Sequence, residues 1–497
     1  MHFGSGNIFR GFIAVLQQRL LESKDAEHGI VAAETFDAEI IDKVFEPFGN
    51  RHINVVLGAD GSLDAEIVAS VAESVALRQG GASGLRRLGE HFAKPGLQMV
   101  SLTLTEKGYW LRDAGGALLP SARRDFEAGP KAPSHAMCVL AALLHERFKA
   151  GGHKVAVVSM DNISKNGDAV RAAVAEAAKA WHENGFVERG FLDYLCDKSA
   201  VSFPLTMIDK ITPRPDDAVA VELEKRGLEG MRPLVTGKGT YIAPFVNSER
   251  PGYLVIEDDF PAGRPPLEKA GVYFTDRETV GKAESMKVAT CLNPLHTAMS
   301  VYGCLLGYTR ICEAMKDADI ARLITRLGYA EGLPVAAEPG ILSPKAFLDE
   351  VIGERLPNPF LPDSPQRIVT DTSQKVGIRF GETVKRYREH GLSLAGLTAL
   401  PLGLAGWLRY LLAVDDDGKE MELSPDPMMD DLQAALCGIV WNEPKSYGGQ
   451  LMAILKNPAV FGSDLTETAL AAKIEEMFVA LLSGKGAVRR TLRAMLD

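Results

Sequence analysis

The first half of the chain alternates short apolar runs with segments of helical period. The runs are nearly continuous in Val, Ile, Leu and Ala, and Gly, Asp or Asn bounds them. Such runs are typical of parallel strands that are covered on both faces. The pattern indicates an α/β fold with a mostly parallel sheet. We predict strands at residues 29–33, 53–57, 97–104 and 154–159, and a helix at 12–21.

The second half has a different pattern. From about residue 284 onward the apolar positions follow a helical period, and convincing β runs are scarce. The preceding region, 214–280, mixes Pro, Gly and short β runs, and we predict a sheet extension and hinge there. We therefore expect a nucleotide-binding α/β domain at 1–280 and a mainly α-helical substrate and catalytic domain at 281–497.

Two stretches without charged residues, 288–309 and 392–408, are long enough to raise the question of a membrane span. The first contains Asn293-Pro294 and His296, and the second contains Pro401 and several glycines. These residues favour buried segments of a large core, so we expect no membrane partner.

Composition narrows the class of protein. Hydrophobic residues make up 46% and charged residues 24%, which is typical of globular proteins and excludes disordered and fibrous classes. Lys and Arg number 55 against 65 Asp and Glu, a net charge of −10. This balance lacks the basic footprint of a nucleic-acid binder. Six cysteines without a CxxC pair, and an N-terminus without a signal-peptide pattern, favour a cytoplasmic protein, which we expect to be a monomer or small homo-oligomer.

The opening Gly4-Ser5-Gly6 lies between a stub of strand and a helix. Glycines there let backbone N–H groups approach a pyrophosphate at the helix N-terminus, although Phe9 replaces the third glycine of the usual fingerprint. Glu34 or Asp37, about 30 residues on, would meet the adenosine ribose, and no Arg is nearby for a 2′-phosphate. We expect NAD rather than NADP. A plain tight turn and a solvated acidic loop are the alternatives.

Two further segments carry polar groups suited to catalysis. Asn162 follows the predicted strand at 154–159, where parallel sheets bind ligands, and an amide can donate to an oxyanion. Lys287 borders an uncharged run, Asn293 is a predicted N-cap, and His296 lies in the first turn of the same predicted helix. A partly desolvated lysine can act as a general base. The alternative is a helix cap with a core histidine and a lysine that extends to solvent.

A metal centre is not indicated. The His and Cys residues are scattered, with no HxxxH or HExxH, so the ligands of a zinc alcohol dehydrogenase are missing.

Taken together, the motifs resemble those of the mannitol dehydrogenase family, the long-chain polyol and uronate dehydrogenases. They occur in the order of that family and span most of the chain. The matching stretches are 2–11, 100–109, 160–167, 203–213, 287–296 and 367–375.

The resemblance implies an N-terminal Rossmann-type domain, a mainly helical C-terminal domain with the site between them, and metal-independent hydride transfer between NAD and a secondary alcohol. It implies that Lys287 is the general acid/base, that Asn162 and Asn293 hold the substrate oxygen, that His296 orients it, and that Glu284 relays protons. The implied cofactor-binding residues are Gly4, Gly6, Asn7, Ile8, Arg10, Glu34, Asp37 and Thr105. The implied substrate-binding residues are Lys107, Asp209, Arg367 and Lys375.

Two departures from the family pattern stand out. The gap from Lys287 to Asn293 is one residue longer than in the mannitol-oxidising branch, which predicts a bulge or a shifted alignment. Only Met1, His2 and Phe3 precede the glycines, so we expect either a start upstream of Met1 or a sheet that begins with a stub.

The substrate is less well determined than the reaction. Arg367 and Lys375 are eight residues apart and suit a carboxylate, although such residues also occur where the substrate is a polyol. We favour the fructuronate/mannonate pair. A hexitol/ketohexose pair and the tagaturonate/altronate pair are alternatives. A non-catalytic NAD-binding regulator is a further alternative, but it would not need Lys287, Asn293 and His296.

Overall fold

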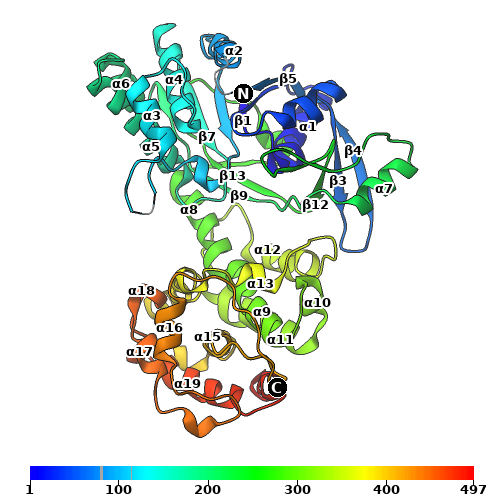
Figure 1. Ribbon diagram of the computed structural model, residues 1–497, viewed down its shortest axis with the longest axis vertical. Coiled ribbons are helices and arrows are strands. Elements are labelled where there is room, and N and C mark those ends of the chain that lie inside the picture. The colour runs from blue at the N-terminus through cyan, green and yellow to red at the C-terminus, as the bar shows by residue number, and fades with distance from the viewer. Residues whose placement is uncertain (79–81, 114, 497) are drawn as a thin grey trace. The chain divides into compact units, whose positions relative to one another are not determined.

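The computed structural model describes residues 1–78, 82–113 and 115–496. It divides into two compact units (Figure 1). Unit 1 comprises Met1–Gly58 and Ser62–Gly281, and unit 2 comprises Ala59–Gly61 and Lys282–Asp497. The predicted fold class is confirmed, because unit 1 is built on a parallel sheet and unit 2 is mainly helical.

The main sheet of unit 1 has six strands, and every neighbouring pair in it is parallel. The strand order is β5-β2-β1-β6-β7-β8, so β1 and β6 flank the point where the order reverses. Counted along the chain, these six strands have the 3-2-1-4-5-6 order of dinucleotide-binding folds. The strands are β1 (His2–Phe3), β2 (Ile30–Glu34), β5 (Val71–Ala76), β6 (Met99–Leu102), β7 (Val155–Ser159) and β8 (Val201–Ser202).

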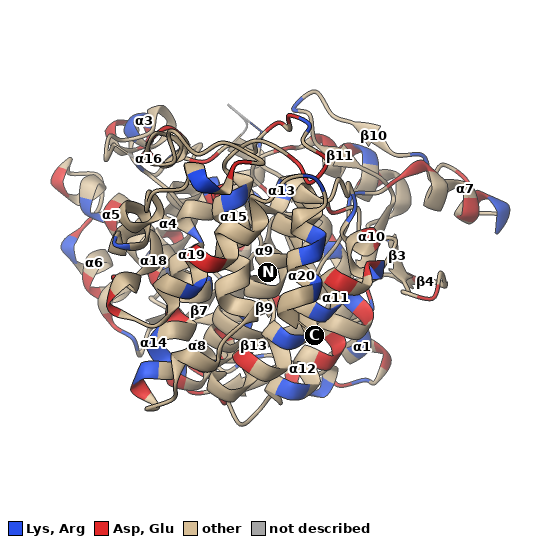
Figure 2. Cartoon of the chain, turned by 90° about the horizontal axis from the view of Figure 1, so that it is seen from below, with Lys and Arg blue, Asp and Glu red and all other residues tan. Residues whose placement is uncertain are grey.

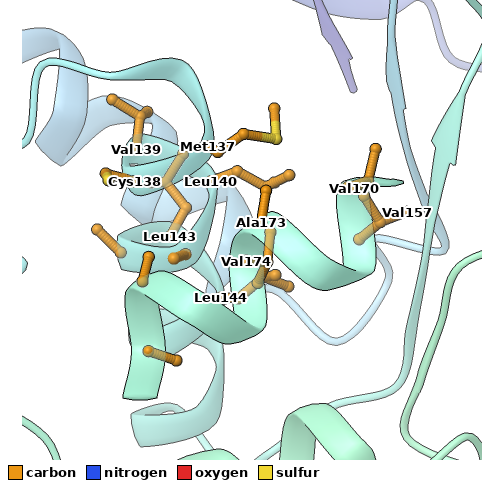
Figure 3. Close-up of a cluster of buried hydrophobic side chains, with 14 of the residues drawn as sticks. Met137, Cys138, Val139, Leu140, Leu143, Leu144, Val157, Val170, Ala173 and Val174 are labelled. Atoms are coloured by element: carbon orange, nitrogen blue, oxygen red, sulfur yellow. The ribbon is translucent and has the colours of Figure 1, made fainter. Parts of the chain in front are cut away.

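Alternate residues of the strands enter two separate hydrophobic clusters, as the twofold period of a strand requires. In β7, Val155 and Val157 join one cluster, while Ala156 and Val158 join the other. Figure 3 shows Val157 beside Val170 and Leu144 beside Val174, and all four residues belong to the first of these clusters. Both faces of the sheet are therefore covered, as the continuous apolar runs predict.

Figure 1 shows α3, α4, α5 and α6 gathered on the β7 side of the sheet. The helices that begin in unit 1 are α1 (Ala14–Glu22), α2 (Ala82–Phe92), α3 (Pro120–Ala128), α4 (Ala136–Lys149), α5 (Asn166–Glu183), α6 (Arg189–Cys196), α7 (Asp217–Lys225) and α8 (Arg277–Ser285).

The remaining strands of unit 1 form three smaller sheets, which corrects two predictions. The run at 53–57 is a strand, but it lies in a separate sheet, because the turn at Gly58–Ser62 folds it back into an antiparallel hairpin. The strands of the 214–280 region likewise do not extend the main sheet. The small sheets contain β3 (His52–Leu57), β4 (Leu63–Val68) and β12 (Phe245–Glu249); β9 (Thr206–Asp209), β13 (Tyr253–Glu257) and β14 (Tyr273–Thr275); and β10 (Leu234–Val235) with β11 (Tyr241–Ile242).

Unit 2 is a helical assembly built around α15, in which every residue is buried. α15 packs against α19 and α9. Figure 2 shows acidic and basic residues interspersed along α11 and α20, where Arg489 pairs with Asp317 and Asp319. The α-helices are α9 (Asn293–Leu305), α10 (Ile311–Lys316), α11 (Ala318–Thr325), α12 (Pro344–Glu350), α13 (Pro365–Ile368), α14 (Glu382–Glu389), α15 (Ala399–Tyr410), α16 (Met429–Ala435), α17 (Leu451–Leu455), α18 (Pro458–Phe461), α19 (Leu470–Leu481) and α20 (Ala487–Leu496).

The two uncharged stretches correspond to α9 and α15, together with their flanking turns. Both helices are largely buried inside unit 2. They approach closely at Gly406, where an added Cβ would lie 2.7 Å from the ring of Tyr302. Within the described part of the chain, no helix combines the length and apolarity needed to cross a membrane.

Several helical segments have π-helical hydrogen bonding, in which each turn contains an extra residue. Three of them are relevant to the predicted site: η1 carries Arg10, η6 carries Lys287, and η11 begins two residues after Lys375. The π-helical segments are η1 (Phe9–Ile13), η2 (Ile41–Phe45), η6 (Met286–Cys291), η7 (Arg326–Gly332), η9 (Val351–Arg355) and η11 (Gly377–Gly381).

Candidate active site

The glycine turn follows β1 directly. Gly4 has φ +97°, and an added Cβ would lie 2.0 Å from the carbonyl oxygen of Thr103, so only glycine fits there. Gly6 is exposed, and a Cβ on it would meet nothing within 4 Å. The chain then enters the helical segment that contains η1 and α1. The first turn position is therefore constrained by β6, while the second leaves open space for a ligand.

Glu34, at the end of β2, organises this turn. Its carboxylate accepts hydrogen bonds from the backbone N–H of Ser5 (2.9 Å), Phe36 (2.8 Å) and Asp37 (3.1 Å). A carboxylate has about four acceptor positions, so one remains for a ribose hydroxyl. The structure thus brings Glu34 to the glycine turn.

Asp37 has a different environment. It accepts a 2.6 Å hydrogen bond from the hydroxyl of Thr236, in the turn between β10 and β11. Burial alone would raise the pKa of Asp37, but this bond and others from Thr240 and the Glu39 backbone outweigh it and hold the pKa below its ordinary value. Asp37 is thus an ionised group that already has protein partners.

The fold also brings a cation to the end of β2, which the sequence analysis missed. Lys238 donates to the carbonyl oxygen of Phe36, and its Nζ lies 4.7 Å from the centre of the Phe36 ring. The ring itself is 64% exposed. No nearby sequence signal marks Lys238, because it lies about 200 residues from Phe36.

Arg10 lies in the interior, and Asn7, which bonds to it, is half-buried. The Arg10 side chain is fully buried, and it donates to the carbonyl oxygen of Ala243 (2.7 Å) and to the side chain of Asn7 (3.0 Å). Protein partners thus engage two of its guanidinium nitrogens, whereas its buried Nε has no hydrogen-bond partner in the described part of the chain. That Arg10 binds the cofactor stays a prediction. Ile8, between them, is half-buried.

The carboxyl ends of β6 and β7 are joined through Asp161. Its carboxylate accepts a 2.6 Å hydrogen bond from the backbone N–H of Leu104 and a second hydrogen bond from the hydroxyl of Tyr109. Burial raises the pKa of Asp161 to about 7. Asn162 follows at once and is exposed. Asp161 was not predicted as a site residue, although its position directly after a buried strand could have indicated it.

The other predicted residues of unit 1 lie near these strand ends or beyond them. Thr105 and Lys107 are exposed, in and before the short 3₁₀ turn Glu106–Gly108. Asp209 ends β9 and is buried.

Asn166 is a structural residue. Its buried side chain donates to Asp161 and Thr206 of its own unit, and it is the first residue of α5.

In unit 2, Lys287 lies in η6 and its side chain is only 2% exposed. The Leu292 N–H donates to the Lys287 carbonyl oxygen at 3.1 Å, which is a π-type bond. The extra residue predicted between Lys287 and Asn293 is thus accommodated as a π-bulge. Glu284 is half-buried and three residues earlier, so it lies near the same helical face.

Asn293 and His296 lie in the first turn of α9, and both are half-buried. The prediction that Asn293 is the N-cap is wrong by one residue: Leu292 occupies that position, and Asn293 is the first helical residue, followed by Pro294. The π-bulge ends immediately before the new helix, which moves the boundary. The three-residue spacing still places Asn293 and His296 on one face.

A cluster of cations lies on α13 and on the segment between α13 and α14. Arg367 forms a two-point ion pair with Asp363, and its side chain is 72% exposed. Lys375 donates to the Thr370 carbonyl oxygen at 2.5 Å. Burial lowers the pKa of Lys375, and the neighbouring charge of Arg379 lowers it further.

Arg379 was not among the predicted residues. It donates a 2.5 Å hydrogen bond to the hydroxyl of Thr297, which in turn donates to the Asn293 carbonyl oxygen at 3.0 Å. Its spacing of four residues from Lys375 was the available sequence signal. Through Thr297, Arg379 is connected to the turn that carries Asn293 and His296.

Over residues 1–78, 82–113 and 115–496, no group of three or more His, Cys, Asp or Glu side chains is arranged to hold a metal ion.

These features define a class first: a Rossmann-type dinucleotide-binding unit followed by a helical unit that carries a buried lysine, an amide and an imidazole. The Mannitol dehydrogenase Rossmann domain matches residues 1–269, and the Mannitol dehydrogenase C-terminal domain matches residues 280–482. The chain belongs to the mannitol dehydrogenase family. It is therefore an oxidoreductase acting on CH–OH groups, as the sequence motifs predict.

Similar curated proteins include two D-mannonate oxidoreductases. The protein from Thermotoga maritima (strain ATCC 43589 / DSM 3109 / JCM 10099 / NBRC 100826 / MSB8) is 49% identical over 100% of this chain and 92% of its own length. The protein from Escherichia coli (strain K12) is 28% identical over 94% of this chain and 90% of its own length. A mannitol 2-dehydrogenase from Pyrenophora tritici-repentis (strain Pt-1C-BFP) is 28% identical over 100% and 81%.

Two solved structures share the fold. A D-sorbitol dehydrogenase in substrate-free form has a TM-score of 0.81 at 24% identity, covering 100% of this chain and 94% of that one. The Pseudomonas fluorescens mannitol 2-dehydrogenase in ternary complex with NAD and D-mannitol has a TM-score of 0.69 at 25% identity, covering 100% and 93%.

Proposed function

We propose that the chain is an NAD-dependent, metal-independent oxidoreductase that interconverts D-fructuronate and D-mannonate. The observation that carries this proposal is the 49% identity, along the whole chain, to a D-mannonate oxidoreductase. The buried Lys287 and the Asn293–His296 turn supply the polar groups that a secondary alcohol dehydrogenase needs.

The residues of unit 1 fit a dinucleotide. The open space at Gly6 and the remaining acceptor position of Glu34 suit a pyrophosphate and an adenosine ribose respectively. The mannitol 2-dehydrogenase structure, a fold relative, is a complex with NAD. When bound, NAD supplies or accepts the hydride. Gly4, Gly6, Ile8 and Glu34 would hold it, with Thr105 near the end of β6.

The proton chemistry belongs to the protein. Lys287 Nζ would take the alcohol proton during oxidation and return it during reduction, as a general acid/base. Asn162 and Asn293 would donate to the substrate oxygen as negative charge develops on it, and His296 would orient that oxygen. Glu284, near the same helical face as Lys287, would pass the proton to water.

A hexitol/ketohexose pair is the second candidate. It is favoured by the fold relative that binds D-mannitol and by the mannitol 2-dehydrogenases among the similar proteins. The ion pair of Arg367 with Asp363 also weakens the assignment of Arg367 to a substrate carboxylate.

A single plate of NADH-oxidation assays with D-fructuronate, D-tagaturonate and D-fructose tests the proposal. We expect kcat/KM for D-fructuronate to exceed the other two at least tenfold. A preference for D-fructose would replace the proposal with the polyol alternative, and a preference for D-tagaturonate would move it to the altronate pair. Absence of turnover with all three, together with NADH binding, would favour a regulator.

We also propose a cytoplasmic location and a monomer or small homo-oligomer. Fractionation of the source cells tests the location, and light scattering of the purified chain measures the oligomeric state.

A further inference from the structure

The cations near α13 and α14 differ in whether the protein neutralises them. Arg367 has a bidentate carboxylate partner in Asp363. Lys375 and Arg379 lie close enough to each other for the charge of one to lower the pKa of the other. Lys375 also feels the charges of two carboxylates, Asp371 and Asp426, which oppose this lowering.

Arg379 is the least compensated of the three. It is half-buried, and burial lowers its pKa from 12.5 to about 10. Its guanidinium donates to the Thr297 hydroxyl at 2.5 Å, and no carboxylate in the described part of the chain pairs with it. Removing a charge from water without a counter-charge costs free energy of desolvation. An anionic group on a bound ligand would supply that counter-charge and offset the desolvation penalty of Arg379.

Arg379 is connected through Thr297 to the turn that carries the proposed catalytic residues Asn293 and His296. Thr297 directly follows His296 and is four residues from Asn293, so all three lie on adjoining positions of the first turns of α9. The guanidinium has five N–H donors, and the bond to Thr297 uses one. The others suffice for two parallel bonds to a carboxylate.

We propose that Arg379 binds the substrate's carboxylate, with Lys375 as the second cation, and so selects sugar acids over neutral polyols. This inference rests on the proposed function and names the group that determines its substrate class. Arg367 then acts on the substrate only indirectly, because Asp363 already satisfies its charge.

If Arg379 only stabilises the structure around Thr297, a different result is expected. If the guanidinium serves only to hold Thr297, and through it the Asn293 turn, then its loss harms charged and neutral substrates alike. Thr297→Val, which removes the hydroxyl but keeps the side-chain volume, isolates that contribution.

The experiment compares Arg379→Gln, Arg379→Lys and Thr297→Val with wild type, using D-fructuronate and D-fructose at saturating NADH. Arg388→Gln is the matched control, because it removes one exposed positive charge from α14 in the same unit. We expect Arg379→Gln to lower kcat/KM for D-fructuronate by ~10²-fold, as for the loss of hydrogen bonds to a charged group, and for D-fructose by less than about threefold. Arg379→Lys should fall between, Thr297→Val should affect both substrates equally, and Arg388→Gln should stay near wild type.

Calorimetry gives a second readout that needs no turnover. Binding of D-mannonate and D-mannitol to the NAD-saturated protein should show that Arg379→Gln and Arg379→Lys weaken only the acid. If Arg379→Gln does not fold, an unchanged acid-to-polyol ratio in Arg379→Lys overturns the inference. Equal losses on both substrates in Arg379→Gln overturn it as well. If the wild type prefers D-fructose and D-mannitol, the proposed function and this inference are both overturned. If the wild type prefers the acids but the acid-to-polyol ratio is unchanged in the Arg379 variants, this inference alone is overturned.

Discussion

Lys287, the proposed general acid/base, combines burial with an unusual backbone conformation. Its side chain is 2% exposed, and a π-helical turn rather than a regular α-turn carries it. π-bulges occur frequently at functional sites, because the additional residue changes the direction of the neighbouring side chains. Burial of a lysine is unfavourable, so its presence there favours a functional role over a lysine that extends to solvent.

Lys287→Ala should therefore lower turnover by about 10²–10⁴-fold, the range for loss of general acid–base catalysis. NADH affinity should change little, and small primary amines should restore part of the rate. Steady-state kinetics and NADH fluorescence titration measure both effects. Lys385→Ala, which removes an exposed lysine of α14, is the control. Near wild-type turnover of Lys287→Ala with a saturating good substrate would refute the acid/base assignment.

We expect the stability of unit 1 to depend on pH through Asp161. Burial raises its pKa from 3.8 to about 7, so the folded state binds a proton more tightly than the unfolded chain. The stability that this proton contributes is fully present below pH 3.8 and is lost as the pH rises through about 7. The loss has an upper limit of about 4 kcal/mol, at 1.36 kcal/mol per pKa unit.

Asp161→Asn removes this titration while keeping an oxygen that can accept from Tyr109 and Leu104. Its free energy of unfolding relative to wild type should therefore rise between pH 4 and pH 7.5. Urea unfolding at several pH values measures the difference, and Asp193→Asn, on the exposed face of α6, is the control. Parallel pH profiles for Asp161→Asn and wild type would contradict the raised pKa.

At the scale of elements, α15 depends on a cap from outside its own segment. The Glu331 carboxylate accepts hydrogen bonds of 2.7 Å from the backbone N–H groups of Thr398, Ala399 and Leu400 at the start of the helix. Glu331 is 3% exposed, so water cannot replace it. A negative charge at a helix N-terminus is also favourable toward the helix dipole.

Glu331→Ala should lower the free energy of unfolding by about 3 kcal/mol, because it leaves buried N–H groups without an acceptor. Chemical denaturation monitored by circular dichroism measures this change. Glu389→Ala, at an exposed position of α14, should change stability by less than about 0.5 kcal/mol. A loss below 1 kcal/mol in Glu331→Ala would mean that the helix start rearranges to satisfy its own donors.

At the scale of the whole molecule, contacts between distant segments determine the environment of the cofactor turn. As the predicted ribose contacts, Glu34 and Asp37 would favour a ribose hydroxyl over a 2′-phosphate, because a carboxylate repels the phosphate. Lys238 reaches the same loop from the turn between β10 and β11 and adds a positive charge to it. We therefore propose that two carboxylates and one lysine act in opposite directions on the choice between NAD and NADP.

We expect kcat/KM with NADH to exceed that with NADPH, and Lys238→Ala to widen the difference by lowering the efficiency with NADPH alone. Initial rates with each cofactor at saturating substrate measure the ratio. Lys225→Ala, an exposed lysine of α7, should leave the ratio unchanged. Comparable efficiencies of the wild type with the two cofactors would contradict the preference for NAD.

The sequence alone determined those features that depend on local patterns. Apolar runs predicted the central strands β2, β6 and β7, because a strand covered on both faces needs apolar residues throughout. The glycine turn could be predicted because Gly4 occupies a backbone conformation that other residues rarely adopt. The edge strand β5, Val-Ala-Glu-Ser-Val-Ala, was missed because its polar residues conceal the pattern.

The tertiary structure decided which segments become neighbours. An apolar run records burial but not the partner strand, so the sequence could not show that 53–57 joins β4 and β12 rather than the main sheet. Lys238 and Glu331 meet their partners across long stretches of chain, and no local pattern specifies such a contact. The environment of Arg379 is of the same kind. The sequence shows that residue 379 is a cation. Only the folded chain shows that the Arg379 side chain is half-buried, donates a hydrogen bond to Thr297 and, within the described residues, is not neutralised by a carboxylate.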